Sequence, residues 1–334
     1  MERRVIGTRI RRSRPLSRPE DLNLRQYYDK RNEILFLREV GGLGDILMHR
    51  MMFEDFKAIC PDFKIVFACP KVYHDAVRDH PFIDKILDSN EVDPYEYLVY
   101  FNTSAPCGRY EMKIAPLSDL HRSDIWSQHC GVNLTNHDMH IRMSDEEKAI
   151  GRKTISSLPG YRGQPTVAIC PISAMAGKNL DLNQIAGVVE GVRRRGLLPF
   201  AVHKTPILDV IKSRCDMVSG LGLREWMGVM HEADYVISVD TSSFHCRGGM
   251  NKPQVGVFSF ANGDTYGKYY TKLEIVQGPC PIGHKGCYNW SICPKISSGP
   301  CFPCGKDLES SQILLALDRL LSRFPVPENA MNQN

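Results

Sequence analysis

The chain has 334 residues, of which 43% are hydrophobic and 24% charged, and its formal net charge is +4. This composition excludes a disordered chain, and the length exceeds that of one ordinary domain, so we expect two domains. No run of about 18 apolar residues occurs, and no apolar stretch follows the basic amino terminus. The sequence therefore predicts a cytoplasmic protein with no membrane span and no secretory signal.

Positive charge gathers at the amino terminus, where seven arginines stand against one glutamate within the first 18 residues. We predict that residues 1–30 form a basic N-terminal extension. Clustered arginines neutralise phosphates, so the extension is typical of a chain that binds an anionic partner such as nucleic acid or a lipid surface. A solvated tail is the alternative interpretation.

The first half of the chain has the pattern of an α/β domain. An apolar run at residues 33–40 predicts a strand that enters a glycine turn at residues 41–45. The apolar spacing that follows predicts a helix up to residue 58. Further strands are expected at residues 64–69, 85–87 and 97–101, and further helices at residues 73–78 and 144–157.

A cluster of proline and glycine at residues 158–165 predicts a linker, after which the same pattern starts again. Repeated strand–loop–helix units on both sides of the linker predict an α/β fold with two doubly wound, Rossmann-like domains facing a cleft. The predicted domains are residues 31–158, residues 159–308, and a C-terminal helix and tail at residues 309–334. In the second half we expect strands at residues 166–170, 198–202, 235–239 and 254–258, and helices at residues 182–195, 224–233 and 310–324.

Two loops after predicted strands carry candidate site residues, because ligands of doubly wound sheets bind at the carboxyl ends of strands. The first holds Gly44 and Asp45, whose carboxylate can accept a proton from a hydroxyl group; a helix-capping aspartate is the alternative. The second holds Ser173 and Lys178, a hydroxyl and a cation that suit a phosphate group. A solvated surface lysine is the alternative there.

A third loop, at residues 240–249, combines small polar side chains with a histidine. Free amides and hydroxyls at a strand end and helix start suit a pyrophosphate, and His245 can donate to a phosphate oxygen or contact a sugar. A structural histidine is the alternative. The predicted ligand-binding residues of this loop are Asp240, Thr241, Ser242, Ser243 and His245.

Five of the twelve cysteines fall within 25 residues near the C-terminus, at residues 280–304. This density, together with one pair at a two-residue spacing, predicts a structural zinc ion held by four of the five thiolates. Disulfides or free thiols are the alternative. The five candidate ligands are Cys280, Cys287, Cys293, Cys301 and Cys304.

The Gly-Leu-Gly-Asp turn at residues 42–45, the Lys178 loop and the Asp-Thr-Ser-Ser-Phe-His segment at residues 240–245 together resemble glycosyltransferase family nine, the heptosyltransferase-like enzymes. The resemblance implies a GT-B fold, with an acceptor-binding domain at residues 31–158 and a donor-binding domain at residues 159–308. It also implies inverting transfer without a metal cofactor for catalysis.

The same resemblance implies roles for individual residues. Asp45 would be the base, and Lys178 would stabilise the leaving phosphate. Ser242 replaces the family's usual glycine, which leaves the donor sugar open. The residues implied to bind the donor are Gly44, Ser173, Asp240, Thr241, Ser242, Ser243 and His245.

Three functions follow from these observations. The leading one is transfer of a sugar from a nucleotide-sugar donor to a hydroxyl acceptor on a glycan or a lipopolysaccharide core. The arginine-rich terminus makes a bacteriophage DNA glycosyltransferase acting on hydroxymethylated bases the first alternative. A non-catalytic nucleic-acid-binding protein with a zinc knuckle is the second.

Overall fold

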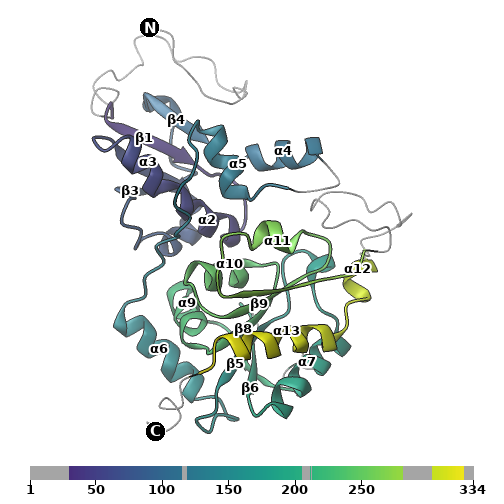
Figure 1. Ribbon diagram of the computed structural model, residues 1–334. Helices are drawn as coiled ribbons and strands as arrows, with labels where there is room; N and C mark the ends of the chain where they lie inside the picture. Colours follow the sequence, from purple (N-terminus) through teal and green to yellow (C-terminus); the bar gives the residue numbers. More distant parts are fainter. Residues whose placement is uncertain (1–29, 115–118, 205–210, 212, 281–302, 327–334) are drawn as a thin grey trace. The chain divides into compact units, whose positions relative to one another are not determined.

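The computed structural model describes residues 30–114, 119–204, 211, 213–280 and 303–326 (Figure 1). Contacts divide the chain into two compact units. Unit 1 comprises the described residues up to Tyr110 together with Arg122–His140, and unit 2 comprises Glu111–His121 and the described residues from Ile141 onward. Each unit contains one parallel sheet.

Unit 1 is built on a four-stranded sheet with the strand order β3-β2-β1-β4. Strand β1 is buried on both faces. Leu35 and Leu37 belong to one core cluster, while Phe36 points the other way and packs edge-on against Phe53 and Phe56 of α3. The elements up to the end of α5 are β1 (Glu33–Leu37), α2 (Leu43–His49), η2 (Arg50–Met52), α3 (Phe53–Ile59), β2 (Lys64–Cys69), η3 (Lys71–Ala76), β3 (Lys85–Asp88), η4 (Pro94–Glu96), β4 (Val99–Asn102), α4 (Pro106–Ile114) and α5 (Arg122–His129).

Unit 2 is built on a six-stranded parallel sheet with the order β10-β9-β8-β5-β6-β7. Read from β7, this is the 3-2-1-4-5-6 order of a doubly wound sheet, and the direction of winding reverses between β5 and β8. Helices α7 and α13 supply apolar residues at helical spacing to the core. The remaining elements are α6 (Asp145–Ser156), β5 (Thr166–Cys170), η5 (Ala176–Lys178), α7 (Leu182–Arg194), β6 (Leu198–Val202), β7 (Asp216–Val218), α9 (Leu223–Glu232), β8 (Tyr235–Val239), α10 (Ser242–Gly249), β9 (Gln254–Phe258), α11 (Gly263–Tyr266), β10 (Leu273–Gln277), α12 (Pro303–Lys306) and α13 (Ser310–Arg323).

Helix α6 packs with unit 2 through a close backbone contact with α9. A Cβ atom at Gly151 would lie 2.4 Å from the carbonyl oxygen of Gly228, and one at Gly228 would lie 2.4 Å from the carbonyl oxygen of Glu147. The two helices therefore approach where neither has a side chain. The sequence pattern divides the chain after residue 158, whereas the contacts place α6 with the second unit, and the chain changes unit after His140.

Two arginines anchor the chain on either side of this change of unit. In unit 1, the buried Arg50 donates to the carbonyl oxygens of residues 139–140, each at 2.5 Å. In unit 2, Arg224 donates to the carbonyl oxygen of Arg142 at 2.6 Å. Ile141 is the one residue between the two anchored stretches.

The predicted strands agree closely with the observed ones, and β2, β5, β6, β8 and β9 have the predicted bounds. Strand β4 begins at Val99, two residues later than predicted, because the preceding residues turn through the 3-10 helix η4. The predicted helix at residues 73–78 is the 3-10 helix η3. Among the described residues, no helix has both the length and the apolar character needed to cross a membrane.

Candidate active site

The candidate residues form two sets, one in each unit. In unit 1, Asp45 lies in the first turn of α2, directly after the glycine loop that follows β1, and β1 and β4 are neighbours. In unit 2, the loop that carries Lys178 follows β5 and the loop that starts at Asp240 follows β8, and these strands are neighbours too. In each sheet the winding reverses between these two strands, which is the position that doubly wound sheets use for ligands.

Two arginines hold the Asp45 carboxylate. Arg122 Nη1 lies 2.8 Å from one carboxylate oxygen, and Arg38 Nη2 lies 3.1 Å from the other. The second oxygen also accepts from the backbone N–H of Gly42 at 3.3 Å. Asp45 thus caps the first turn of α2 and binds two guanidinium groups at the same time. The helix-capping aspartate named as the alternative and the candidate carboxylate are therefore compatible.

These contacts set the ionisation of Asp45. Burial by itself raises the pKa of this carboxyl, but the charges of Arg122 and Arg38 and the hydrogen bond from Arg122 outweigh it. The net pKa lies well below the usual range of an aspartate. Asp45 is therefore ionised near neutral pH, and it is a weaker base than an unpaired carboxylate.

The glycine turn before Asp45 is shaped for this arrangement. Gly41 has φ of 127°, a conformation that side-chain-bearing residues rarely adopt. A Cβ atom there would lie 2.6 Å from Arg38 Nη2 and 2.7 Å from the Asp45 carboxylate. Gly41 thus allows the backbone to pass beside the ion pair.

Arg38 is fixed from several sides. Its guanidinium donates to the carbonyl oxygens of Thr103 and Ser104 after β4, and it lies 5.1 Å from the ring centre of Trp126 in α5. Only 5% of its side chain is exposed, against 14% for Arg122. Arg38 is therefore built into the unit, whereas Arg122 lies closer to the surface.

His49 contacts the backbone of Asp45 and the Thr103 side chain. Its Nδ1 lies 2.7 Å from the backbone carbonyl oxygen of Asp45, and its Nε2 lies 2.8 Å from the Thr103 hydroxyl. Burial, together with the charge of Arg38, lowers the pKa of His49 to about 3. The imidazole is therefore neutral near pH 7, and it joins the end of β4 to the start of α2.

In unit 2, Lys178 and Asp240 form a close ion pair. Lys178 Nζ lies 2.6 Å from Asp240 Oδ2, and the side chains are only 14% and 6% exposed. A carboxylate accepts hydrogen bonds and repels phosphate, so Asp240 suits the orientation of Lys178 better than direct contact with a diphosphate. The structure thus brings together two predicted residues, and the donor contact predicted for Asp240 remains a prediction.

His245 lies beside this pair in α10. Its Nε2 is 3.9 Å from Asp240 Oδ1, and its Nδ1 is 2.9 Å from the Tyr270 hydroxyl. Both rings are buried. The predicted cluster therefore continues as a chain of polar groups from Lys178 through Asp240 and His245 to Tyr270.

The start of α10 presents backbone amides beside the same cluster. Thr241 is the N-cap residue and makes no side-chain cap, and Ser242 and Ser243 occupy the first turn. The first amides of a helix have no partner within the helix and carry partial positive charge, which suits an anion. Ser243 lies within hydrogen-bonding reach of the buried Cys170 thiol, so its hydroxyl is directed into the unit.

The Ser173 hydroxyl is engaged within its own loop. It donates to the carbonyl oxygen of Met175 at 3.0 Å, while the Ser173 amide donates to Asn179. Ser173 therefore shapes the turn that carries Lys178. Its predicted contact with the donor remains a prediction.

The zinc prediction rests mostly outside the described residues, where Cys287, Cys293 and Cys301 lie. Cys280 and Cys304 are described, and neither forms a disulfide with another described cysteine. Within the described ranges, no group of three or more histidine, cysteine, aspartate or glutamate side chains is arranged to hold a metal. The described part of the chain gives the zinc prediction no support.

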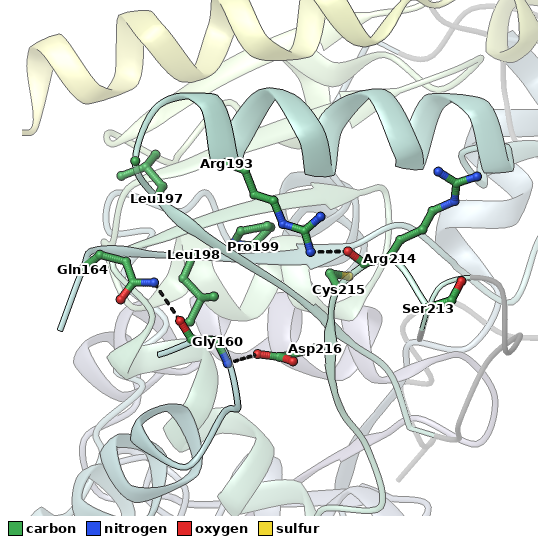
Figure 2. A pocket seen from close by; sticks show the side chains of 11 residues that line it. Gly160, Gln164, Arg193, Leu197, Leu198, Pro199, Ser213, Arg214, Cys215 and Asp216 are labelled. Atoms are coloured by element: carbon green, nitrogen blue, oxygen red, sulfur yellow. Dashed lines mark hydrogen bonds between the residues drawn. The ribbon is translucent and has the colours of Figure 1, made fainter. Parts of the chain in front are cut away.

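A cavity of about 500 Å³ lies elsewhere in unit 2 (Figure 2). It is lined by Leu198 and Asp216, the first residues of β6 and β7, and by Arg193 of α7. Figure 2 shows Arg193 bonded to the backbone of Arg214 and Asp216 bonded to the Gly160 amide. This cavity is at the amino ends of the strands, opposite the loops of the candidate site, and we do not assign the reaction to it.

The sequence profile of glycosyltransferase family 9 (heptosyltransferase) matches residues 121–287, which are 167 of the 334 residues and thus half of the chain. The chain belongs to glycosyltransferase family 9. This membership makes it an enzyme of sugar transfer, and the predicted family and activity are confirmed. Comparison with curated protein sequences finds no significant match.

Solved structures of a family 9 glycosyltransferase and of two further sugar transferases share the fold of this chain at low sequence identity. A family 9 glycosyltransferase from Veillonella parvula has a TM-score of 0.69 and 15% identity, covering 87% of this chain and 98% of the other. The E. coli ADP-heptose lipopolysaccharide heptosyltransferase II has a TM-score of 0.64 and 12% identity, covering 87% and 99%. TibC, an iron-containing dodecameric glycosyltransferase from enterotoxigenic E. coli, has a TM-score of 0.65 and 13% identity, covering 88% and 77%.

These likenesses confirm the predicted GT-B fold with two α/β units. They lend no support to DNA modification or to a nucleic-acid-binding zinc module. Sequence reasoning missed three residues of the family 9 candidate site, namely Arg38, Arg122 and Tyr270. Arg38 left a readable signal, since a charged residue directly after a buried strand marks a strand end facing a site.

Proposed function

We propose that this family 9 enzyme transfers a sugar, with inversion, from a nucleoside-diphosphate sugar to a hydroxyl of a glycan or lipopolysaccharide acceptor. Unit 2 binds the donor, and unit 1 binds the acceptor. The observation that carries the proposal is the Lys178–Asp240 ion pair beside His245 and the start of α10, at the reversal point of the unit 2 sheet.

On the donor side, departure of a nucleoside diphosphate builds negative charge. Lys178, the first amides of α10 and a donor nitrogen of His245 offer positive charge and hydrogen bonds to that group. Asp240 holds the Lys178 ammonium in place through their 2.6 Å contact. Because these groups supply the positive charge, we include in the proposal that catalysis needs no metal ion.

On the acceptor side, Asp45 receives the proton of the attacking hydroxyl. The depressed pKa of Asp45 makes it a weak base toward a free alcohol. However, transfer passes through an oxocarbenium-like state, and the acceptor oxygen becomes strongly acidic once it bonds to the anomeric carbon. A weak, fully ionised base is sufficient for that late proton transfer.

The step balances as follows. The acceptor oxygen forms a bond to the anomeric carbon on the face opposite the diphosphate, and the bond from that carbon to the diphosphate oxygen breaks. The bonding pair leaves with the nucleoside diphosphate, and the hydroxyl proton goes to Asp45. One inversion at the anomeric carbon results.

A binding screen tests the proposal. The full chain is heated with a panel of nucleoside-diphosphate sugars, including ADP-heptose and the common UDP- and GDP-sugars, and bound donors are identified by mass spectrometry. We expect at least one donor to raise the melting temperature, and Lys178→Met to remove that rise. If no nucleoside-diphosphate sugar binds the wild-type protein, the proposal is wrong.

A further inference from the structure

In the hydrogen bond between His245 and Tyr270, one group must donate and the other must accept. The Tyr270 hydroxyl lies 2.9 Å from His245 Nδ1, and both side chains are buried, with 8% and 3% of their surfaces exposed. A neutral imidazole has one nitrogen that donates and one that accepts. Which nitrogen carries the proton decides what the other side of the ring offers to a ligand.

The buried hydroxyl of Tyr270 needs a hydrogen-bond acceptor. Burial, followed by the charge of Asp240, raises the pKa of Tyr270 well above its ordinary value, so the hydroxyl keeps its proton. Within the described residues, His245 Nδ1 is the hydrogen-bond partner of this hydroxyl. If Nδ1 carried a proton, the buried phenol hydrogen would face another hydrogen and lose its acceptor, at a cost typical of an unsatisfied buried donor.

The Tyr270 ring is also held in place. It packs edge-on against Phe244, with ring centroids 5.3 Å apart. A Cβ atom at Gly248 would lie 2.5 Å from the Tyr270 ring, so the ring lies directly on the bare backbone of α10. The hydroxyl therefore has little freedom to turn away from His245.

We propose that Tyr270 is a positioning residue that fixes the neutral imidazole of His245 with its proton on Nε2, the nitrogen that faces Asp240. The Tyr270 hydroxyl donates to Nδ1, and the proton on Nε2 is thereby directed to the side of the ring where Lys178 is held. An imidazole of the opposite tautomer would present a lone pair on that side, which repels a phosphate oxygen.

This inference rests on the proposed function for its consequence, since an N–H group at this place serves the binding of a diphosphate. It extends the donor site by a residue that does not touch the ligand. Tyr270 acts through His245, and its removal is therefore without effect once His245 is gone.

The first test reads the tautomer directly, with no ligand present. The full chain is labelled with 15N-histidine, and long-range 1H–15N correlation spectra at pH 8 identify the protonated nitrogen of His245, assigned by difference from His245→Gln. We expect an Nε2–H tautomer with a hydrogen-bonded Nδ1, and an Nδ1 signal that moves to the position of a nitrogen without a hydrogen bond in Tyr270→Phe. An Nδ1–H tautomer or an imidazolium in the wild type overturns the proposal.

The second test measures binding of inorganic pyrophosphate by calorimetry. We expect Tyr270→Phe to weaken binding about tenfold, as for loss of one oriented hydrogen bond to a charged group. The control is Tyr235→Phe, which also removes a buried phenol that donates to a backbone oxygen, at 2.7 Å from Phe324, but at the opposite end of β8. Tyr235→Phe leaves binding unchanged.

A double-variant cycle separates positioning from packing. In the His245→Gln background, adding Tyr270→Phe causes no further loss of pyrophosphate binding, whereas equal losses in both backgrounds overturn the proposal. If pyrophosphate does not bind the wild type at all, the diphosphate site of the proposed function fails, and the tautomer spectra still decide the role of Tyr270.

Discussion

Arg122 holds one oxygen of the Asp45 carboxylate at 2.8 Å, and the two residues are 77 positions apart in the chain. Helix α5 therefore completes the charge balance of a turn that begins directly after β1. The pairing sets how strongly Asp45 attracts a proton, and it makes the acid side of the reaction's pH profile a measurable property of Arg122.

Replacing Arg122 by glutamine removes one of the two charges that depress the Asp45 pKa, so that pKa rises toward its ordinary value. If Asp45 is the proton acceptor, the acid limb of the kcat/KM profile then lies at higher pH in the variant than in the wild type. Initial rates are measured from pH 9 down to the lowest pH at which both proteins stay folded. Lys57→Gln, which breaks an exposed ion pair in the same unit, leaves the profile in place. An unshifted acid limb in Arg122→Gln speaks against Asp45 as the base.

Gly41→Ala strains the turn that carries Asp45. Its φ of 127° disfavours any side chain, and the new Cβ atom meets Arg38 and Asp45. We expect sugar transfer to fall at least about tenfold, consistent with roughly 1–3 kcal/mol of local strain. Gly42→Ala is the control, because its φ is −89° and nothing lies within 4 Å of the added atom. Equal activity of both variants contradicts the prediction.

Lys178→Met leaves the buried carboxylate of Asp240 without its cation. We expect the free energy of unfolding to fall by on the order of 3 kcal/mol and transfer activity to be lost. Unfolding in urea measures the change in stability. Adding Asp240→Asn restores most of the stability and none of the activity. A double variant as unstable as Lys178→Met alone contradicts this account.

The exposed pair of Arg195 and Asp318 in the same unit provides the comparison for that experiment. Their atoms also approach to 2.6 Å, but the side chains are 27% and 45% exposed. Arg195→Met therefore costs less than about 1 kcal/mol. The contrast between the two ion pairs isolates the effect of burial.

The buried His49 makes stability depend on pH. Its folded pKa of about 3 lies below the unfolded value of 6.5, so the unfolded chain takes up a proton first as the pH falls. The contribution of His49 to the free energy of unfolding is therefore fully present above pH 6.5. It declines by about 1.4 kcal/mol per pH unit as the pH falls toward 3. His80, whose pKa burial lowers to about 2, acts in the same direction.

His49→Gln tests this dependence through the slope of stability against pH. Between pH 4 and 6, the free energy of unfolding of the variant depends less steeply on pH than that of the wild type, by about 1.4 kcal/mol per pH unit. This difference in slope is expected whatever the overall stability of the variant. Between pH 7 and 9 the slopes of variant and wild type agree, because the imidazole is neutral in both states. Equal slopes in the acid range contradict a neutral, buried His49.

The sequence indicates where the candidate site lies better than it indicates which groups surround it. Asp45, Lys178 and His245 are predictable because each follows a buried strand, and strand ends gather at one edge of a parallel sheet. Arg122 and Tyr270 reach their partners across long stretches of chain, and no local pattern encodes such contacts. The same limit applies to packing, since the short β7 and the half-exposed β10 lack the continuous apolar run that marks a buried strand.

The placement of α6 shows a second kind of limit. The run of proline and glycine at residues 158–165 resembles a linker, and it follows a charged helix. The contact that ties this helix to unit 2 depends on Gly151 meeting Gly228. Two glycines in separate helices give no sign of such an approach until the helices are packed.

The arginine anchors on either side of Ile141, Arg50 and Arg224, indicate where a chimera with a related enzyme should be joined. A chimera with another family 9 enzyme joined at Ile141 keeps Arg50 with its carbonyl partners in one parent and Arg224 with its own in the other. A junction at residue 158 would instead separate α6 from α9 and expose their bare glycine surfaces. Exchange of unit 1 between relatives therefore has a junction at this single residue, with the unit 2 segment Glu111–His121 taken from the parent that supplies unit 2.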